Sequence, residues 1–280
     1  MIVSRDVRLG DGRVVRAHDS GLDRPEAVVV WHHGSPQTGA LLEPLLLAAA
    51  ERGIRLLSYG RPGYGGSSRL VGRDVVSAAR DVEQVADAFG VGRFAVMGAS
   101  GGGPHALACA AVLPERVSGV VCLAGMAPFT EEFDWYAGMA APGGLRAAEQ
   151  GLAARERFTE EFDPSSFTPA DWAALSGQWT SLGADAQRAE QAGGEGLVDD
   201  DLAFVRPWGF DLAEVTAPVL LVQGGQDRVA PPSHADWLRG LLPRAELWSR
   251  PEDGHISVLY ACAEAMGWLR AGPMSRTALS

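Results

Sequence analysis

Short apolar runs alternate with amphipathic stretches along most of the 280-residue chain. The apolar runs are rich in branched residues and too short for core helices, which is typical of strands buried on both faces. Such strands are expected at residues 27–32, 54–59, 94–97, 117–123, 219–223 and 245–248. Strands that alternate with helices form a mostly parallel sheet with helices on both faces. The pattern therefore predicts an α/β fold.

The stretches between the apolar runs have the spacing of helices. In residues 74–89, apolar side chains recur every three or four positions, and Gly90 ends the pattern. Helices are likewise expected at 41–52 and 103–113. The first residues differ, because 3–9 and 13–18 alternate around a Gly-Asp-Gly turn. They predict an antiparallel pair of strands.

One long segment, between Ala124 and Ala217, lacks a convincing strand pattern. It is rich in Ala, Glu, Gln and aromatic residues, and it is too long for an ordinary connection. We predict a core formed by residues 1–127 and 210–280, and a helical cap at 128–209 over the carboxyl edge of the sheet. The cap aromatics can face a ligand or fill the cap's own interior, and for any single one the interior is the safer assumption.

The pentapeptide Gly98-Ala99-Ser100-Gly101-Gly102 stands between a predicted strand and a predicted helix. A G-x-S-x-G sequence in this setting describes a nucleophile elbow, a turn so sharp that glycine is needed on both sides of the serine. The pentapeptide alone is a modest signal, since Gly and Ser are common in loops. The flanking strand and helix favour Ser100 as a nucleophile.

A serine hydroxyl needs a base, and the base needs an orienting carboxylate. After an elbow of this kind, the acid and then the histidine follow along the chain. Asp227 comes directly after a predicted strand, and His255 lies in the loop between the last predicted strand and the last helix. Asp253 competes as the acid but shares the loop of the histidine. The remaining histidines are better explained as structural: His18, His32, His33, His105 and His234.

Acyl transfer also needs donors for the developing oxyanion, and backbone N–H groups serve. Gly101, immediately after the nucleophile, supplies one. The second is expected in the loop after residues 27–32, where Gly34 lets the backbone approach closely and Ser35 offers its N–H. Pro36 has no N–H to donate. The Ser35 hydroxyl either points into the site or stabilises the loop.

The composition limits which partners the protein can bind and which catalytic side chains it can use. The 24 basic and 35 acidic residues give a net charge of −11, which argues against nucleic acid or an anionic membrane as a partner. All the basic residues are arginine, and the chain has no lysine and no asparagine. Lysine-based mechanisms are therefore excluded. The bias is typical of a GC-rich bacterial genome.

Cysteine usage and the N-terminus bear on location. The three cysteines, Cys109, Cys122 and Cys262, fit a reducing compartment, and no C-x-x-C or His/Cys spacing suggests a metal. No apolar run is long enough for a transmembrane helix, and the first residues lack the regions of a signal peptide. We expect a cytoplasmic protein, a monomer or homodimer, without metal or cofactor.

Five landmarks occur in the same order as in a known family. They are His33-Gly34, the Arg-Pro-Gly-Tyr-Gly-Gly-Ser segment at 61–67, the pentapeptide at 98–102, residues 223–227 and Gly254-His255. In these features the chain resembles the α/β-hydrolase superfamily over nearly its whole length. The resemblance implies an eight-stranded sheet with a helical cap, and catalysis by Ser100, His255 and Asp227.

The chain also differs from some members of the superfamily, and two of these differences argue against particular activities. Relatives often carry Asp where this chain has Gly60, which predicts a looser hydrogen bond in that loop. Haloalkane dehalogenases and epoxide hydrolases use Asp at the position of Ser100, so those activities are not expected. Prolyl aminopeptidases usually have a Gly-Gly-Pro-Gly type of oxyanion loop and a Trp after the serine, and both are absent here.

The leading hypothesis is a serine hydrolase that cleaves a small, apolar carboxylic ester or similar acyl compound through an acyl-enzyme. Thioester or lactone hydrolysis, cofactor-free perhydrolysis, and acyl transfer or cyclisation use the same groups. A ligand-binding protein that merely keeps the fold is a further alternative, against which the complete triad argues. Substrate contacts are expected from His33, Gly34, Met126, Trp135, Trp179 and Trp208.

Overall fold

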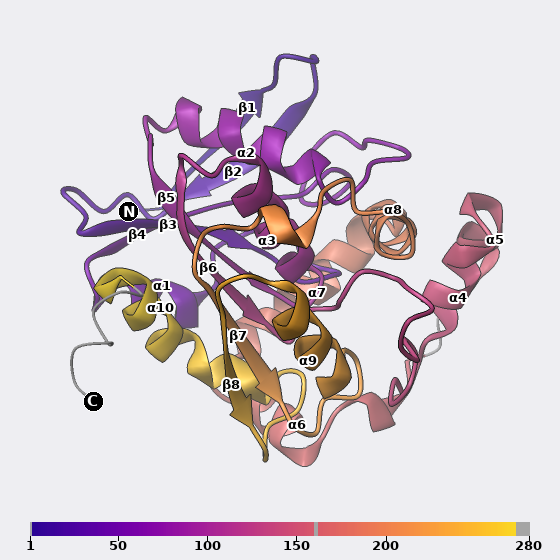
Figure 1. Cartoon of the computed structure of the whole chain (residues 1–280). Coiled ribbons are helices and arrows are strands. Elements are labelled where there is room, and N and C mark those ends of the chain that lie inside the picture. Colours follow the sequence, from indigo (N-terminus) through magenta and orange to yellow (C-terminus); the bar gives the residue numbers. More distant parts are fainter. Residues whose placement is uncertain (1, 160–161, 273–280) are drawn as a thin grey trace.

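Eight strands form one mostly parallel sheet in the order β1-β2-β4-β3-β5-β6-β7-β8 (Figure 1). The structure, a computed structural model, describes residues 2–159 and 162–272. The strands are β1 (Val3–Arg8), β2 (Val14–Asp19), β3 (Ala27–His32), β4 (Ile54–Tyr59), β5 (Phe94–Ala99), β6 (Val117–Leu123), β7 (Val219–Gly224) and β8 (Ala245–Arg250). β2 is antiparallel to both β1 and β4, and the other pairs are parallel. The predicted strands and the N-terminal hairpin are confirmed.

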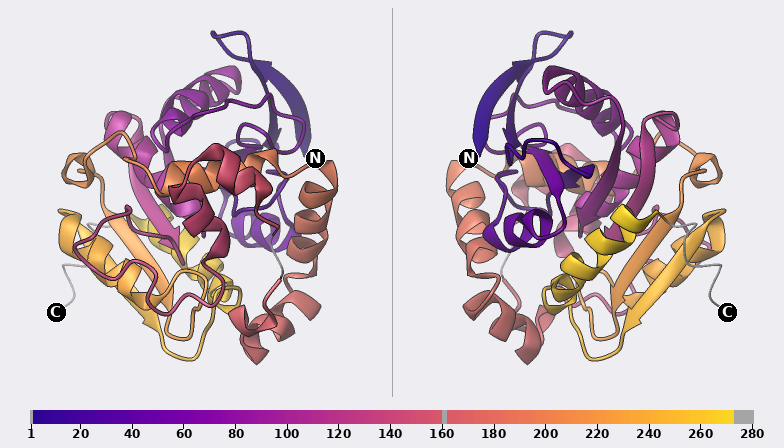
Figure 2. Two further views of the ribbon diagram at one scale, coloured as in Figure 1. Left: turned by 90° about the vertical axis from the view of Figure 1, so that its right-hand side faces the viewer. Right: turned by 90° about the vertical axis from the view of Figure 1, so that its left-hand side faces the viewer.

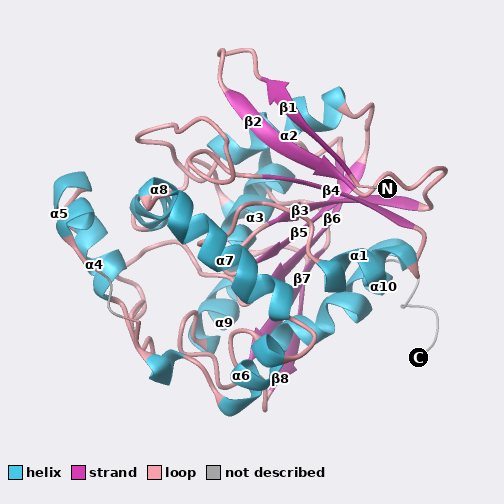
Figure 3. Ribbon diagram, turned by 180° about the vertical axis from the view of Figure 1, so that it is seen from behind, coloured by secondary structure: helices cyan, strands magenta, loops and turns pink. Residues whose placement is uncertain are grey.

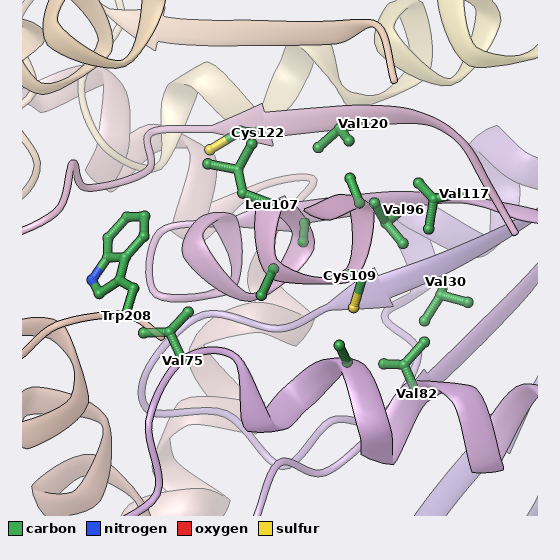
Figure 4. Packing of buried hydrophobic residues seen from close by; sticks show 14 of the residues in the cluster. Val30, Val75, Val82, Val96, Leu107, Cys109, Val117, Val120, Cys122 and Trp208 are labelled. Atoms are coloured by element: carbon green, nitrogen blue, oxygen red, sulfur yellow. The ribbon is translucent and has the colours of Figure 1, made fainter. Parts of the chain in front are cut away.

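The parallel strands are apolar on both faces because helices cover both sides of the sheet. Neighbouring residues of one strand point to opposite faces, so Val96 joins one buried cluster and Met97 the other. Figure 4 shows Val30, Val96 and Val120 of the first cluster facing Leu107 and Val82 from the covering helices. This two-sided core fixes the register of the strands that carry the loops described below.

The helices divide between the two faces. One face is covered by α2 (Ser77–Ala88), α3 (Gly102–Val112) and α9 (Pro232–Leu241), and the other by α1 (Glu43–Ala50) and α10 (Cys262–Ala271) (Figure 3). α1 begins later than expected, since Pro44 stands in its first turn and disfavours helix before it. Among the described residues, no helix is long and apolar enough to cross a bilayer.

The segment between β6 and β7 is helical, and no strand is found in its described residues. Its helices are α4 (Gly143–Glu149), α5 (Leu152–Arg157), α6 (Pro169–Ser176), α7 (Thr180–Ala192) and α8 (Glu195–Phe204), with short 3-10 turns at η1 (Pro164–Ser166) and η2 (Leu212–Glu214). We call residues 128–209 the helical segment; positions 160–161 of it, like 1 and 273–280 of the predicted core, lie outside the described residues. The left view of Figure 2 shows α4, α5 and α8 in front of the sheet and α6 and α7 beside it.

Candidate active site

The site lies where the strand order reverses direction. β3 stands between β4 and β5, so the connections that leave β3 and β5 diverge at the carboxyl ends of two adjacent strands. Such a switch point is the usual ligand site of an open parallel sheet. The loop after β3 carries Gly34 and Ser35, and Ser100 follows β5 directly. The topology therefore brings the predicted oxyanion loop beside the predicted nucleophile.

Ser100 occupies the sharp turn expected of a nucleophile elbow. Its φ of 52° lies in the left-handed region, which non-glycine residues rarely adopt. A Cβ atom at Gly98 would lie 2.3 Å from the carbonyl oxygen of Gly102, so a side chain is impossible there. The strain is held by the flanking strand and helix, and the Ser100 N–H donates to Leu123 O at 2.9 Å.

The structure brings Ser100, His255 and Asp227 into one hydrogen-bonded chain. His255 Nδ1 lies 2.8 Å from Asp227 Oδ2, and His255 Nε2 lies 3.0 Å from Ser100 Oγ. An ionised carboxylate only accepts, so Nδ1 carries the proton and Nε2 is left to accept from the serine hydroxyl. Asp227 and His255 are buried, whereas Ser100 is half-buried.

The electrostatics of His255 are set by carboxylates. Burial alone would lower its pKa, but the charge and hydrogen bond of Asp227, together with the charge of Asp171, raise the pKa above its ordinary value. Asp227 is itself fixed, since its Oδ1 accepts from Val229 N at 2.8 Å and from Ala230 N at 2.9 Å. These bonds hold the carboxylate in place for the imidazole.

The side chains of the candidate oxyanion loop are engaged in hydrogen bonds, and one backbone donor of this loop and one after the nucleophile remain for an oxyanion. Gly34 N–H donates to Gln37 Oε1, and the Ser35 hydroxyl donates to Asp200 Oδ2 at 2.5 Å. The hydroxyl therefore stabilises the loop. Within residues 2–159 and 162–272, neither the Ser35 N–H nor the Gly101 N–H has an acceptor. A Cβ at Gly34 would lie 3.6 Å from Ser100 Cβ, which places this loop against the nucleophile.

Asp200 of α8, which sequence reasoning missed, ties the helical segment to the oxyanion loop. It is fully buried and accepts from Ser35, Arg61, Tyr64 and Arg73. Burial alone would raise its pKa, but the charges of Arg61 and Arg73 hold the pKa well below the usual range. The sequence carries a signal for this contact: three consecutive acidic residues at 199–201 could pair with the arginines of residues 61–73.

Gly60 is tightly enclosed. A Cβ there would lie 2.7 Å from Tyr64 O and 2.8 Å from Thr38 O, so no side chain fits at this position. The loop is nevertheless well bonded: Ser67 Oγ donates to Gly60 O at 2.7 Å, and the neighbouring turn is closed by Tyr64 N–H donating to Arg61 O at 2.9 Å. A bond looser than in relatives with Asp here stays a prediction.

Four other histidines are buried and held neutral. His33 Nε2 accepts from Arg61 N–H, so its protonated Nδ1 donates to Gly34 O at 2.6 Å. Burial lowers the pKa of His32 to about 3 and that of His234 to about 4, and it lowers the pKa of His33 and His105 well below the ordinary value. Both ring nitrogens of His33 are occupied, so it supports the loop.

The residues expected to contact substrate are mostly packed inside the protein. Trp135 Nε1 donates to Ala127 O, Trp179 lies in the cluster beneath α1 and α10, and Figure 4 shows Trp208 beside Val75 in the other cluster. Met126 is also buried. The structure shows packing for these side chains, and their contact with a substrate stays a prediction. In the described part of the chain, no group of three His, Cys, Asp or Glu residues could hold a metal ion.

Known proteins resemble this chain over most of its length. It is 30% identical to the pimeloyl-[acyl-carrier protein] methyl ester esterase of Nitrosomonas europaea over 82% of this chain and 89% of that one. It is 27% identical to a 2-hydroxy-6-oxo-6-phenylhexa-2,4-dienoate hydrolase of Burkholderia cepacia, over 86% and 85%. A hydrolase structure from Pseudomonas aeruginosa superposes with a TM-score of 0.72 at 19% identity, covering 98% of both chains, and shows the likeness of the fold.

The family assignment rests on sequence as well as fold. The model of the alpha/beta hydrolase fold family matches residues 27–261, which include the elbow, the candidate acid and the candidate histidine. With the predicted resemblance thus confirmed, the chain belongs to the alpha/beta hydrolase family and is a hydrolase.

Proposed function

We propose that the protein hydrolyses carboxylic esters through a covalent acyl-enzyme on Ser100. The observation that carries the proposal is the continuous chain from Asp227 Oδ2 through His255 to Ser100 Oγ, with separations of 2.8 and 3.0 Å. Both distances are within hydrogen-bond reach of a serine nucleophile and its base. The similarity to a methyl ester esterase supports an ester as the substrate.

In the acylation half of the reaction, His255 Nε2 takes the proton of Ser100 as Oγ bonds to the ester carbonyl carbon. The carbonyl oxygen becomes an oxyanion and accepts hydrogen bonds from the N–H groups of Ser35 and Gly101. Asp227 stabilises the imidazolium. When the C–O bond to the leaving alcohol breaks, His255 returns the proton to the departing oxygen, and the acyl group stays on Ser100.

Deacylation repeats these steps with water. His255 accepts a proton from the water as its oxygen attacks the acyl carbon, and the same two N–H groups bind the second oxyanion. Collapse releases the carboxylic acid and returns the proton to Ser100 Oγ. One donor of this kind contributes about 3–4 kcal/mol to the barrier reduction, so the oxyanion loop is a large share of the catalysis.

The helical segment acts in this proposal as a cap. Three of its buried carboxylates hold core loops: Asp171 holds the loop of His255, Asp185 holds Thr38, and Asp200 holds Ser35. These contacts support a helical segment docked against the loops of the site, and in this proposal it supplies an apolar pocket for the acyl group. The same catalytic groups can also cleave thioesters or lactones, or transfer the acyl group to an acceptor other than water. Activity assays with these substrates and acceptors distinguish the alternatives.

The test combines probe labelling with substrates. A fluorophosphonate should label the wild type, and Ser100→Ala should lose the label, whereas Ser233→Ala, a matched change at an exposed serine on α9, should keep it. A series of p-nitrophenyl esters of increasing length then defines the acyl preference. Labelling without hydrolysis of any ester, combined with cleavage of a 2-hydroxy-6-oxo-dienoate, would contradict the ester proposal.

A further inference from the structure

Asp171 on α6 reaches the loop that carries the candidate base. Its Oδ1 accepts from Ile256 N at 2.8 Å, from Ser257 N at 2.7 Å and from Ser257 Oγ at 2.8 Å. These two N–H groups directly follow His255 and begin η3 (Ser257–Ala261), which has no side-chain cap of its own. Asp171 therefore caps, from a distant part of the chain, the turn that orients the histidine.

The other oxygen of Asp171 fixes the carboxylate to its own helix. Oδ2 accepts from Thr168 N at 2.8 Å and from Thr168 Oγ1 at 3.0 Å, so the residue is part of a capping box at the start of α6. Gly254 makes room for it, since a Cβ there would lie 2.1 Å from Oδ2. The carboxylate is rigidly held between α6 and the histidine loop.

Capping α6 does not by itself explain why the Asp171 carboxylate is fully buried. Asp171 is 0% exposed, and a carboxylate that served only its own helix would be more stable in water. Burial alone would raise its pKa, but the hydrogen bonds from Ser257, Thr168 and Ile256 hold the pKa below its usual value. It is therefore a buried negative charge beside the loop of His255.

The charged groups around His255 are few. Asp227, after β7, bonds to the ring, and Asp171 faces the loop from α6. Asp253, on the ring's own loop, is paired with Arg250 at 2.9 Å, and Ser100 on the opposite side is neutral. The charges of Asp227 and Asp171 both raise the pKa of His255, against the effect of burial.

We propose that Asp171 is a positioning residue for the proposed hydrolysis, which fixes the His255 loop and adds a second negative charge that favours the imidazolium formed during attack. The inference rests on the proposed function. It makes the helical segment a part of the catalytic machinery, because its docking completes the alignment of the base.

Asp171→Asn removes the charge while its side-chain oxygen can still accept from Ile256 N and Ser257 N. Its NH2 group cannot accept from Thr168 N, so Tm is measured alongside the kinetics. The acid limb of the kcat/KM profile for a p-nitrophenyl ester should move to lower pH, with kcat about 10- to 100-fold lower and KM little changed. Asp185→Asn is the matched control, since this buried carboxylate of α7 binds Thr38 instead. It should leave the acid limb in place even where it lowers Tm.

Ser257→Ala removes the Oγ bond to Asp171 and the bond that Ser257 Oγ accepts from Gly254 N, and it keeps the charge of Asp171. It should lower kcat and leave the acid limb unmoved, which makes it a second test if Asp171→Asn does not fold. An unmoved acid limb in folded Asp171→Asn, or a wild-type kcat in Ser257→Ala, overturns the inference. Loss of fluorophosphonate labelling in the wild type would instead overturn the proposed function, so the two failures are distinguishable.

Discussion

Gly102 lies so close to the carbonyl oxygen of His32 that a Cβ atom at position 102 would be 2.1 Å from it. The clash would be with backbone atoms of His32 and His33 and could not be relieved by a side-chain rotation. Gly102→Ala is therefore expected to lower the free energy of unfolding by at least ~2 kcal/mol. Gly92→Ala, at a glycine with no atom within 4 Å of its would-be Cβ, is the control and should stay within ~0.5 kcal/mol in urea titrations. Equal stability of the two variants would contradict the elbow geometry.

The Ser35 hydroxyl is committed to Asp200 and is not available to an oxyanion. Ser35→Ala keeps the backbone N–H and should retain esterase kcat/KM within about tenfold, with about 1–3 kcal/mol lost from stability because the hydroxyl's bonds to Asp200 and from Arg61 are both removed. Steady-state kinetics and thermal unfolding measure the two effects. A fall beyond a hundredfold in a folded variant would instead place the hydroxyl in the oxyanion hole.

Asp200 should matter far more to stability than an exposed carboxylate. Asp200→Asn leaves Arg61 and Arg73 buried with their charges uncompensated and is expected to lower the free energy of unfolding by about 3–5 kcal/mol. Asp6→Asn breaks the exposed pair with Arg16 and should change it by less than ~1 kcal/mol. Comparable losses in the two variants would show that the buried cluster does not anchor the helical segment.

The pH dependence of activity should follow His255. The base must be neutral, and its pKa is raised above the ordinary value of 6.5, so kcat/KM should fall as pH drops through a midpoint above 6.5. Asp227→Asn removes the main charge that raises the pKa and should move the midpoint to lower pH, with a large loss of kcat. A wild-type midpoint well below 6.5 would contradict this electrostatic account.

Much of the fold and the candidate triad were predictable because their signals are local. Strands buried on both faces read as apolar runs, and the elbow needs glycines at fixed positions beside Ser100. Asp227 and His255 follow strands in the order that the elbow predicts. Each of these features depends on a few neighbouring residues, so the sequence alone identifies them.

The roles of Asp171 and Asp200 could not be assigned from the sequence, because they depend on how the helical segment docks; for Asp200, the acidic run at 199–201 was a partial signal that did not name its partners. In the sequence, Asp171 reads as an ordinary helix cap of the Thr-x-x-Asp type, and Asp200 as one of three consecutive acidic residues. Their partners, Ser257 and Ser35, are distant in the chain. The surroundings of the tryptophans also depend on tertiary packing: Trp208 lies in the same buried cluster as Val75, which its own sequence neighbourhood does not indicate, and its contact with a substrate stays a prediction.

The most direct test of the central claim is active-site labelling of the purified protein. A fluorophosphonate should attach to the wild type with one probe per chain, and peptide mass spectrometry should locate it on Ser100. Ser100→Ala should show no label while it folds with the Tm of the wild type. An unlabelled wild-type protein, or equal labelling of Ser100→Ala, would contradict the account of a serine hydrolase.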